Sequence, residues 1–456
     1  MNYLLVALSG LLLTLAFPKT DLWWLAWVAL VPFFVVLSKA AERREAYRLT
    51  LVFGVVYFLG AFYGITPLFR FGGYWIITGW VLLAFFQSLF LLLFTWVFLR
   101  LDPRYRLMAS PFLWIGAEWL RVWGPLGVSV GVVGYSQTPV PAVLQIASLF
   151  QVFGVSFLVI LVNAAIAQLI VEPGRRFFPL AAFLVVAVAL VWGNFVLLQH
   201  PVVNDPPKAL TVALIQSNVD QFDRMNPLLV NQNYELHDTM SRQVGEKVDL
   251  IVWPETAVFA YLAQHFRYFP RLQKLSAETG AWLALGTAYY GEKGRAYNSI
   301  VTISPLGAVV SRYGKEQLVP FGEFLPLRPL IYPILKGTGY FDTEFSSDTA
   351  ISPLIIGRYE AAGAICFEST IPDLIKRRVN KKTAFILTVT NDAWFGDAVT
   401  PYLHWQSGIL RAVENRRYFV QLGNTGLSGL VDPYGRVIKQ SELNKREVVV
   451  VKIPVR

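Results

Sequence analysis

The sequence is poor in the side chains that bind metals or form disulfides, because only one of its 456 residues is cysteine and four are histidine. A single cysteine excludes an intrachain disulfide. The histidines are widely scattered and show no spacing typical of a metal site; they are His200, His237, His265 and His404. We therefore expect neither a metal ion nor any other cofactor.

Charge is also scarce. Charged residues make up 15% of the chain and hydrophobic residues 55%, and the mean hydropathy is +0.48, which is well above that of a typical soluble protein. The net charge is +10, but no basic run is dense enough to predict nucleic-acid binding. The composition favours a membrane-embedded protein.

Long apolar stretches fill the first 200 residues. Most are close to the length of about 20 residues that crosses a bilayer. The stretches are 3–17, 22–38, 49–66, 75–99, 107–120, 143–171 and 179–198. We predict a transmembrane helical domain over residues 1–200 with about seven spans.

The loops between these stretches differ in positive charge. Cytoplasmic loops retain Lys and Arg, and alternate connections carry either many or few of them. The rich set is Lys39, Arg43, Arg44, Arg48, Arg100, Arg104, Arg106, Arg175 and Arg176; the poor set is Lys19, Arg70 and Arg121. This asymmetry predicts a cytoplasmic amino terminus and a second half outside. In a bacterium, that half would face the periplasm from the inner membrane.

From about residue 208, short β-branched runs alternate with polar helical stretches, a pattern typical of β-α-β structure. Predicted strands are 210–216, 249–253, 282–288, 297–303, 308–313, 360–366, 384–390 and 418–423, and predicted helices are 227–246, 269–279, 369–380 and 403–416. Two helix-covered sheets packed back to back would form an α-β-β-α sandwich. We assign this catalytic domain to residues 208–450.

Three candidate catalytic residues follow predicted strands. Cys366 is the lone thiol, Glu255 follows Trp253-Pro254, and Lys315 follows Gly314. A thiol nucleophile needs a base to take its proton and a positive charge to stabilise the oxyanion that forms at a carbonyl. A lone cysteine is also commonly a small buried apolar group. The order and spacing of the three residues favour the catalytic interpretation.

Longer motifs surround these residues. They are Val-Trp-Pro-Glu-Thr at 252–256, Leu-Val-Pro-Phe-Gly-Glu-Phe at 318–324, Ile-Cys-Phe-Glu at 365–368, Asn-Asp-Ala-Trp-Phe-Gly-Asp at 391–397, Gly-Tyr-Ser-Gln at 134–137 and Gly-Val-Ser-Phe-Leu-Val at 154–159. With these motifs, the chain resembles the apolipoprotein N-acyltransferase family, membrane-embedded members of the nitrilase superfamily, over nearly its whole length.

The resemblance implies a nitrilase-like catalytic domain and a two-step acyl transfer. A phospholipid would give a fatty acyl chain to the cysteine as a thioester, and a diacylglyceryl-cysteine apolipoprotein would then accept it on its amino-terminal amine. The implied triad is Glu255, Lys315 and Cys366, with support from Glu323, Phe367 and Glu368. From the residues alone, Glu323 could also be a solvated turn residue, and Glu368 could cap a helix that starts near Ser369.

Two apolar segments, 324–341 and 256–270, could be lids that dip into the outer leaflet or ordinary packed loops.

The chain also departs from the family pattern. The family usually has another span after the catalytic domain, and no such apolar segment precedes Arg456. Arg224 and Met225 stand near the position where the family often has tryptophan, which leaves donor or acceptor recognition open.

Two other function classes stay open. A membrane-anchored amidase of the nitrilase type would use the same triad on a small amide, although the apolar segments argue against it. A binding or scaffold protein could keep the fold without chemistry, but the presence of all three triad residues disfavours that class.

Overall fold

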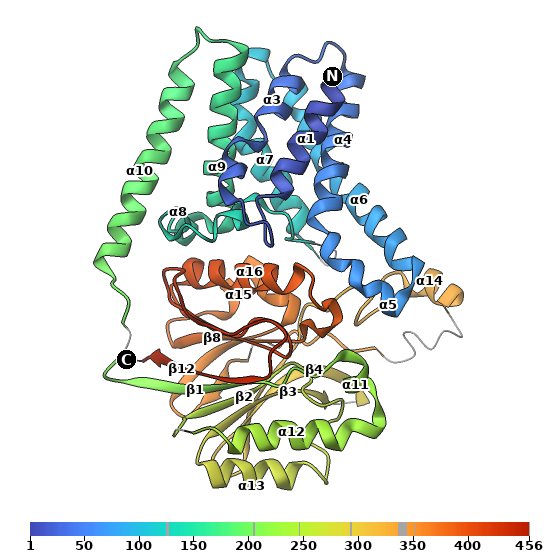
Figure 1. Cartoon of the computed structure of the whole chain (residues 1–456), viewed down its shortest axis with the longest axis vertical. Coiled ribbons are helices and arrows are strands. Elements are labelled where there is room, and N and C mark those ends of the chain that lie inside the picture. The colour runs from blue at the N-terminus through green and yellow to red at the C-terminus, as the bar shows by residue number, and fades with distance from the viewer. Residues whose placement is uncertain are drawn as a thin grey trace. The chain divides into compact units, whose positions relative to one another are not determined.

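Figure 1 shows a computed structural model of the chain, which describes residues 1–124, 127–203, 206–245, 247–291, 294–335, 344–350 and 352–455. The chain forms two compact units. The first comprises Met1–Pro201 and Ala398–Arg416, and the second comprises Val202–Asp397 and Arg417–Arg456. The first unit therefore includes a helix from the second half of the sequence.

The first unit is helical. Its longer helices are α1 (Asn2–Thr14), α3 (Val31–Ser38), α4 (Arg43–Ala61), α6 (Tyr74–Arg100), α7 (Arg106–Val122), α9 (Ala147–Val171), α10 (Phe177–Gln199) and α16 (Thr400–Asn415). Shorter α-helices are α2 (Ala26–Ala29), α5 (Phe69–Gly72) and α8 (Pro141–Leu144). Each apolar stretch of the sequence thus contains helix, which confirms the helical membrane character of this half.

The number of spans stays a prediction. Within the described part of the chain, α6, α9 and α10 are long and apolar enough to cross a bilayer. A fourth candidate arises if α4 and its continuation to Gly72, bent by 53°, form one span. Helix α9 is interrupted at Phe150 and Gln151, whose backbone angles are not helical. At this break, the amide of Val152 donates a hydrogen bond of 2.8 Å to Glu414 on α16.

Small residues allow the helices of this unit to approach closely, as is common in membrane bundles. A Cβ atom on Gly10 of α1 would lie 2.9 Å from the carbonyl oxygen of Phe53 on α4, and one on Gly54 would lie 2.8 Å from Ser88 Oγ on α6. Beside these crossings, a buried aromatic cluster fills the interior. It comprises Phe33, Phe34, Phe53, Phe94 and Trp114.

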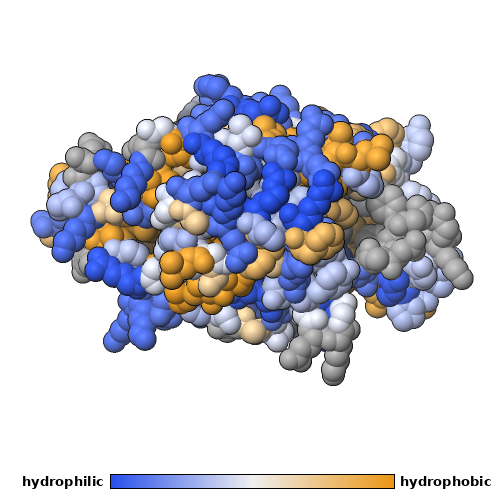
Figure 2. Space-filling view, turned by 90° about the horizontal axis from the view of Figure 1, so that it is seen from below, coloured by the Kyte–Doolittle hydropathy of each residue, from blue (hydrophilic) through white to orange (hydrophobic). Residues whose placement is uncertain are grey.

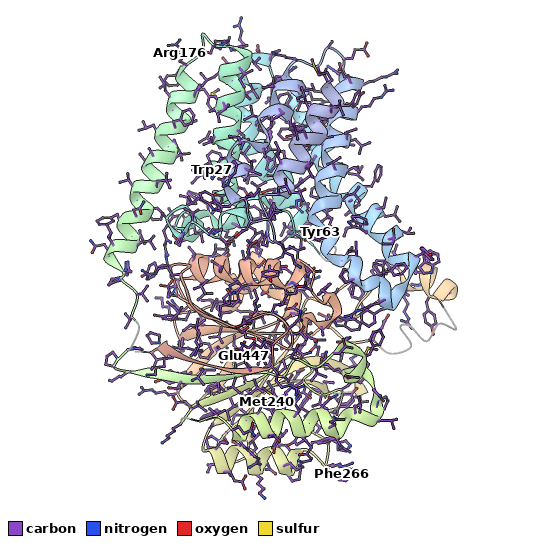
Figure 3. The ribbon with its side chains drawn as sticks, viewed as in Figure 1. Trp27, Tyr63, Arg176, Met240, Phe266 and Glu447 are labelled. Atoms are coloured by element: carbon purple, nitrogen blue, oxygen red, sulfur yellow. The ribbon has the colours of Figure 1, made fainter. Side chains whose placement is uncertain are left out.

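One hydrogen bond joins two loops rich in positive charge, and another joins α1 to the start of α4, next to a third such loop. Arg175 donates to the carbonyl of Arg104 at 3.4 Å, and Asn2 donates to Glu45 at 3.3 Å, beside the start of α4. Within the first unit, Figure 3 shows Arg176 at one end of the bundle and Tyr63 at the other. Two residues on opposite sides of the predicted spans thus lie at opposite ends of the bundle, while the path of the chain across the membrane and the side on which the cytoplasm lies stay predictions.

The second unit contains two sheets, each of six strands in the described residues. Their strand orders are β12-β1-β2-β3-β4-β5 and β11-β10-β9-β8-β7-β6. Strands β1, β2 and β3 are parallel in the first sheet, and β7, β8 and β9 in the second. The strands are β1 (Ala209–Gln216), β2 (Leu250–Trp253), β3 (Trp282–Tyr290), β4 (Ala296–Ile303), β5 (Val309–Gly314), β6 (Leu354–Ile356), β7 (Tyr359–Ile365), β8 (Thr383–Thr390), β9 (Tyr418–Gly423), β10 (Gly429–Val431), β11 (Val437–Gln440) and β12 (Glu447–Pro454).

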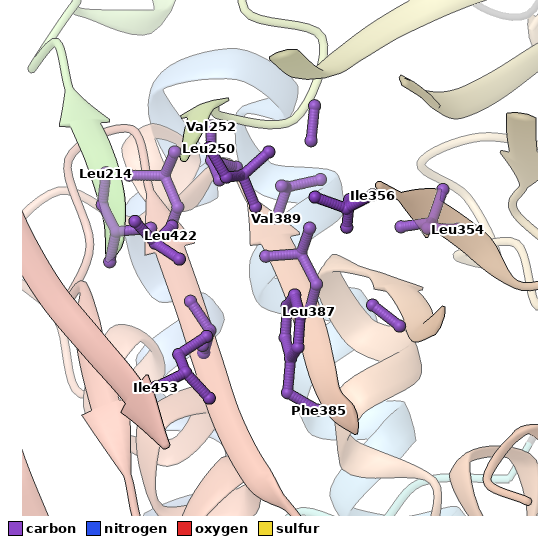
Figure 4. Close-up of a cluster of buried hydrophobic side chains, with 14 of the residues drawn as sticks. Leu214, Leu250, Val252, Leu354, Ile356, Phe385, Leu387, Val389, Leu422 and Ile453 are labelled. Carbon is purple, nitrogen blue, oxygen red and sulfur yellow. The ribbon is translucent and has the colours of Figure 1, made fainter. Parts of the chain in front are cut away.

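The two sheets pack face to face. Apolar side chains from both inner faces form one buried cluster, which includes Leu214 and Val252 from the first sheet and Leu387 and Leu422 from the second. Figure 4 shows these side chains between the strands. This arrangement confirms the predicted pair of back-to-back sheets.

Helices cover the outer faces. A second buried cluster joins the first sheet to α12 (Val230–Arg242) and α13 (Phe269–Thr279), and α15 (Pro372–Arg378) packs against β7. The surface that carries α12 and α13 is largely hydrophilic, with scattered hydrophobic side chains (Figure 2). Such alternation between a buried and a wet helix face is typical of a water-soluble layer.

All eight predicted strands are present, with their ends shifted by at most a few residues. No pattern in the sequence pointed to β6 or β12. The motif Asp-Pro-Tyr-Gly at 432–435, which predicts a turn between paired strands, lies between the short strands β10 and β11, although neither strand was predicted with bounds. Strand β12 pairs with β1 in antiparallel register along its whole length. The predicted helices at 227–246, 269–279, 369–380 and 403–416 correspond to α12, α13, α15 and α16.

The inter-sheet cluster predicts a large cost for truncation of Leu387, which is fully buried. Leu387→Ala should lower the free energy of unfolding by about 2–5 kcal/mol, because it removes apolar contacts and leaves a cavity. Leu306→Ala, at a position that is 93% exposed in the β4–β5 turn, is the matched control and should have little effect. Denaturant unfolding in detergent, followed by tryptophan fluorescence, measures both. Equal effects of the two substitutions would contradict the packing described.

Candidate active site

The three predicted catalytic residues stand just after strands. Glu255 lies two residues beyond β2, Lys315 one residue beyond β5, and Cys366 directly after β7. The first two strands belong to one sheet and β7 to the other. Glu255 and Lys315 are 7% and 1% exposed. The packing of the sheets thus brings together groups that are separated by about 50–60 residues in the sequence.

The ammonium group of Lys315 is the centre of this cluster. Its Nζ lies 2.8 Å from Glu323 Oε2 and 3.5 Å from Glu255 Oε1. The main-chain amide of Lys315 donates to the carbonyl of Asn298 at 2.7 Å, and its carbonyl accepts from Asp348 at 2.9 Å. Both the backbone and the side chain of this lysine are therefore fixed.

Asn298, in the middle of β4, is a residue that the sequence analysis missed. Its Nδ2 donates to Glu255 Oε1 at 2.8 Å and to Glu323 Oε1 at 2.9 Å. One amide group therefore sets the separation of the two carboxylates that flank Lys315. Asn391 completes the set, because its backbone amide donates to Glu255 Oε2 at 2.9 Å. The motif at 391–397 signalled this second residue, whereas no pattern marked the asparagine in the strand.

Glu323 lies against Lys315 rather than in a solvated turn. Besides its contact with the ammonium group, its Oε2 accepts from the backbone amide of Val319 at 2.9 Å. These contacts fit a group that orients the lysine, as the family resemblance implies. Phe367 follows the thiol and is half-buried.

Cys366 has a backbone conformation that L-residues rarely adopt. Its φ is +53°, in the left-handed region, where a side chain other than that of glycine is strained. Strain of this kind at the end of a strand is common where a reactive side chain is presented from a sharp turn. The geometry therefore singles out this cysteine from an ordinary buried apolar one.

The thiol is protonated at neutral pH. Burial and the nearby charge of Glu255 raise the pKa of Cys366 well above its usual value, and the positive charge of Lys315 lowers it only in part. Burial by itself would lower the pKa of Lys315, but Glu323 and Glu255 raise it to a net value above the ordinary one. The resting site thus holds a neutral thiol beside a permanent cation, so attack requires a base to remove the proton.

Glu368 supports the turn at Cys366 through buried hydrogen bonds. Its Oε2 accepts from Tyr313 Oη at 2.6 Å and from the amide of Ile365 at 2.9 Å, and its Oε1 accepts from the amide of Glu316 at 2.8 Å. Arg378 of α15 lies 3.2 Å away as a buried partner. The carboxylate therefore caps the turn that begins at Cys366, through the amide of Ile365, and also joins this turn to the loop after Lys315.

The two predicted lid segments differ in their packing. In 256–270, Tyr268 is buried, while Phe259 and Phe266 are 61% and 85% exposed; Figure 3 labels Phe266 at the margin of the second unit. In 324–341, the described part forms α14 (Arg328–Leu335), where Leu330 is 70% exposed. Residues 336–341 of that prediction lie outside the described residues.

Both halves of the chain match known protein families. The family model of the apolipoprotein N-acyltransferase N-terminal domain matches residues 9–165, and the carbon-nitrogen hydrolase model matches residues 211–456. The apolipoprotein N-acyltransferase of Methylococcus capsulatus is 33% identical over 98% of this chain and 90% of that protein. This chain belongs to the apolipoprotein N-acyltransferase family. The members from Geobacter metallireducens and Pasteurella multocida are 31% and 30% identical, over 98% and 96% of this chain and 88% and 87% of their own.

Membership in the apolipoprotein N-acyltransferase family confirms the predicted fold class and identifies the chain as an acyltransferase of a membrane-embedded family. The hydrolase match covers all six predicted site residues, and the N-terminal match covers most of the apolar helices. The roles of the six residues follow from the geometry above and are taken up as a proposal below.

The surroundings of Glu368 predict a pH-dependent contribution to stability. Burial alone would raise the pKa of this carboxyl. Arg378 and the hydrogen bonds from Tyr313 and the backbone have a larger, opposite effect, so the net pKa lies below the usual value. A carboxyl with a lowered folded-state pKa stabilises the protein above its unfolded pKa of about 4.3, and this stability is lost as pH falls through the folded value. Glu368→Gln should therefore cost about 2–4 kcal/mol at neutral pH, and less near pH 3.

Denaturant unfolding at the two pH values measures this difference. Glu442→Gln is the matched control, because the Glu442 side chain is 74% exposed and pairs only with the exposed Lys445 in the described contacts. It should change stability by less than about 0.5 kcal/mol. A cost for Glu368→Gln that is equal at both pH values would show that the carboxylate charge is not what stabilises the turn.

Proposed function

We propose that this chain transfers a fatty acyl chain from a phospholipid to the amino-terminal amine of a diacylglyceryl-cysteine apolipoprotein. The observation that carries the proposal is the meeting of a thiol, a carboxylate and a buried ammonium group in a chain whose first 200 residues are apolar helices. The names of its relatives support the same reaction class.

In the first step, Glu255 takes the proton of the Cys366 thiol and the sulfur attacks the carbonyl carbon of the phospholipid ester. The tetrahedral oxyanion is stabilised by the Lys315 ammonium group and the backbone amide of Phe367. The contacts with Glu255 and Glu323 use two of the three donors of an ammonium group, so one remains for the oxyanion. The carbon–oxygen bond then breaks, the leaving oxygen takes the proton from Glu255, and a lysophospholipid departs from the thioester.

In the second step, the amine of the apolipoprotein attacks the thioester carbonyl. Glu255 takes a proton from the attacking nitrogen, Lys315 again stabilises the oxyanion, and the carbon–sulfur bond breaks. The sulfur leaves as a thiolate and recovers its proton from Glu255. The products are an amide on the apolipoprotein and the free thiol, so the enzyme returns to its starting state.

Location follows from the charge pattern and the substrates. A phospholipid donor requires access from a bilayer, and a thioester requires limited access of water. Two of the loops rich in Lys and Arg are joined by a hydrogen bond between Arg175 and Arg104 in the first unit, which fits retention of both loops in the cytoplasm. We place the chain in a bacterial inner membrane, with the catalytic domain facing the periplasm.

The thioester predicts a defined gain in mass. Incubation of the purified protein with a phospholipid of known acyl composition should add one acyl group, which hydroxylamine removes. Cys366→Ser should show no gain. Lys315→Ala should reduce the rate of the gain by at least about 100-fold, because loss of one oxyanion donor costs a few kcal/mol. Intact-mass spectrometry measures all three proteins.

The same experiment separates the alternative function. A folded protein that alkylates normally at Cys366 but gains no acyl mass, and that hydrolyses a small amide, would be an amidase and would overturn the acyl-transfer proposal. A protein that acquires the acyl group and passes it to a diacylglyceryl peptide with a free amino terminus would support both steps.

The exposed side chains near α14 predict a membrane-dipping lid. Phe321, Leu327 and Leu330 are 58%, 69% and 70% exposed, a cluster of apolar groups that is costly in water. Leu330→Asp should slow acylation from phospholipid bilayers by about tenfold or more, while acylation from detergent micelles changes little. Leu306→Asp introduces the same charge at a site that is 93% exposed and should have no effect. Normal turnover of Leu330→Asp in bilayers would argue against a membrane-dipping lid.

A further inference from the structure

Arg224 is a buried cation that the proposed mechanism does not use. It lies on the short helix α11 (Gln221–Met225) and is 4% exposed. A buried guanidinium must direct its donors at acceptors, because an unpaired buried charge is very unfavourable. In the described contacts of Arg224, no acidic side chain pairs with it.

Besides Gln221 Oε1, which accepts from Nη1 at 3.4 Å, the partners of Arg224 belong to the turn that carries the proposed base. Its Nε donates to the carbonyl of Thr256 at 2.9 Å and its Nη2 to the carbonyl of Glu255 at 3.0 Å. The Nη2 also contacts Thr256 Oγ1. A planar guanidinium with fixed donors suits two adjacent carbonyls in a way that a lysine ammonium does not. The arginine therefore holds the backbone of the Glu255 turn in place through hydrogen bonds.

This turn is strained and tightly enclosed. Thr256 has a φ of +37°, which is unfavourable for a β-branched residue and persists only where the surroundings hold it. From the other side, a Cβ atom on Gly286 of β3 would lie 2.2 Å from the carbonyl oxygen of Pro254 and 2.6 Å from Glu255 Cα. The Gly286 carbonyl accepts from Ala257 at 2.9 Å. Arg224 and Gly286 thus hold the turn from two sides.

The charge of Arg224 also acts on the reacting groups. Burial lowers the pKa of Arg224 to about 10, while the charges of Glu255 and Cys366 act to raise it, so the guanidinium is still charged at neutral pH. Such an interaction is mutual, so the same charge favours the ionised form of the thiol. Lys315 is therefore accompanied by a second cation near the nucleophile.

We infer that Arg224 is a positioning residue, which holds the Glu255 turn in its strained conformation and places a second positive charge beside the turn of the base. This role rests on the proposed function for its relation to acyl transfer. It is distinct from the role of Lys315, because the described contacts of Arg224 reach the backbone of the base rather than the reacting atoms.

Two variants separate the charge of Arg224 from its hydrogen bonds to the Glu255 turn. Arg224→Met removes both, and Arg224→Lys keeps the charge but loses the planar set of donors. Because the chain has one cysteine, alkylation by iodoacetamide followed by intact mass reports on Cys366 without any phospholipid. A lost cation that shifts the thiol pKa by about one unit slows alkylation at a fixed pH about tenfold. We expect this slowing in Arg224→Met and near-parent alkylation in Arg224→Lys.

Acyl-thioester formation from phospholipid should fall at least about tenfold in both variants, since both lose the hydrogen bonds that hold the Glu255 turn. Arg271→Met and Arg271→Lys are matched controls. Arg271 lies on α13, is partly exposed and pairs with Glu235, and its variants should alkylate and acylate at the parent rates. Alkylation of Arg224→Met at the parent rate would overturn the inference.

A second substitution keeps the test decisive where Arg224→Met fails to fold. Glycine adopts positive φ without strain, so Thr256→Gly should restore part of the acylation that Arg224→Lys loses. Absence of any such recovery would overturn the positioning role. If the parent protein itself gained no acyl group, the proposed function would fail, while the alkylation rates would still decide the role of Arg224.

Discussion

The site depends on one buried charge. The Lys315 ammonium group is almost completely removed from water, and a lone cation there would be prohibitively unfavourable. It persists because Glu323 and Glu255 flank it and because Asn298 holds both carboxylates through a single amide group. The two acids compensate the cation at rest. During the reaction that we propose, one of them is also the base, so the arrangement that makes the charge tolerable also makes it chemically useful.

The packing of the two sheets brings the thiol to this charge cluster. Glu255 and Lys315 are held by strands of one sheet and Cys366 by a strand of the other, so no local segment contains the reacting groups together. The inter-sheet core fixes the distance between the sheets, and Glu368 ties the turn at Cys366 to the loop after Lys315 through buried hydrogen bonds. Rigid strands with supported turns are the kind of scaffold that keeps a nucleophile and its base in register.

Backbone strain occurs at both turns where chemistry is proposed. Cys366 and Thr256 both have positive φ, one at the nucleophile and one directly after the base, and a buried charged side chain supports each turn, Glu368 at the first and Arg224 at the second. In the helical unit, a charged side chain likewise supports the break in α9, since Glu414 of α16 accepts a hydrogen bond from the amide of Val152. The catalytic half of the sequence thus supplies a structural part of the helical unit, which the apolar pattern of the first 200 residues does not reveal.

The sequence by itself determined the helical character of the apolar half and eight of the strands, and it suggested the Glu, Lys and Cys residues of the proposed site, because each depends on a local pattern or a motif. It did not give the bounds of β10 and β11, which are short, and it did not reveal β6, which is also short, or β12, which pairs with a distant strand. The roles of Asn298 and Arg224 were equally hidden, since an asparagine inside a strand and an arginine on a short helix have no distinctive periodicity. Only the tertiary structure decided which carboxylates share the lysine and which cation supports the base, because buried polar groups find their partners across elements that are far apart in the chain.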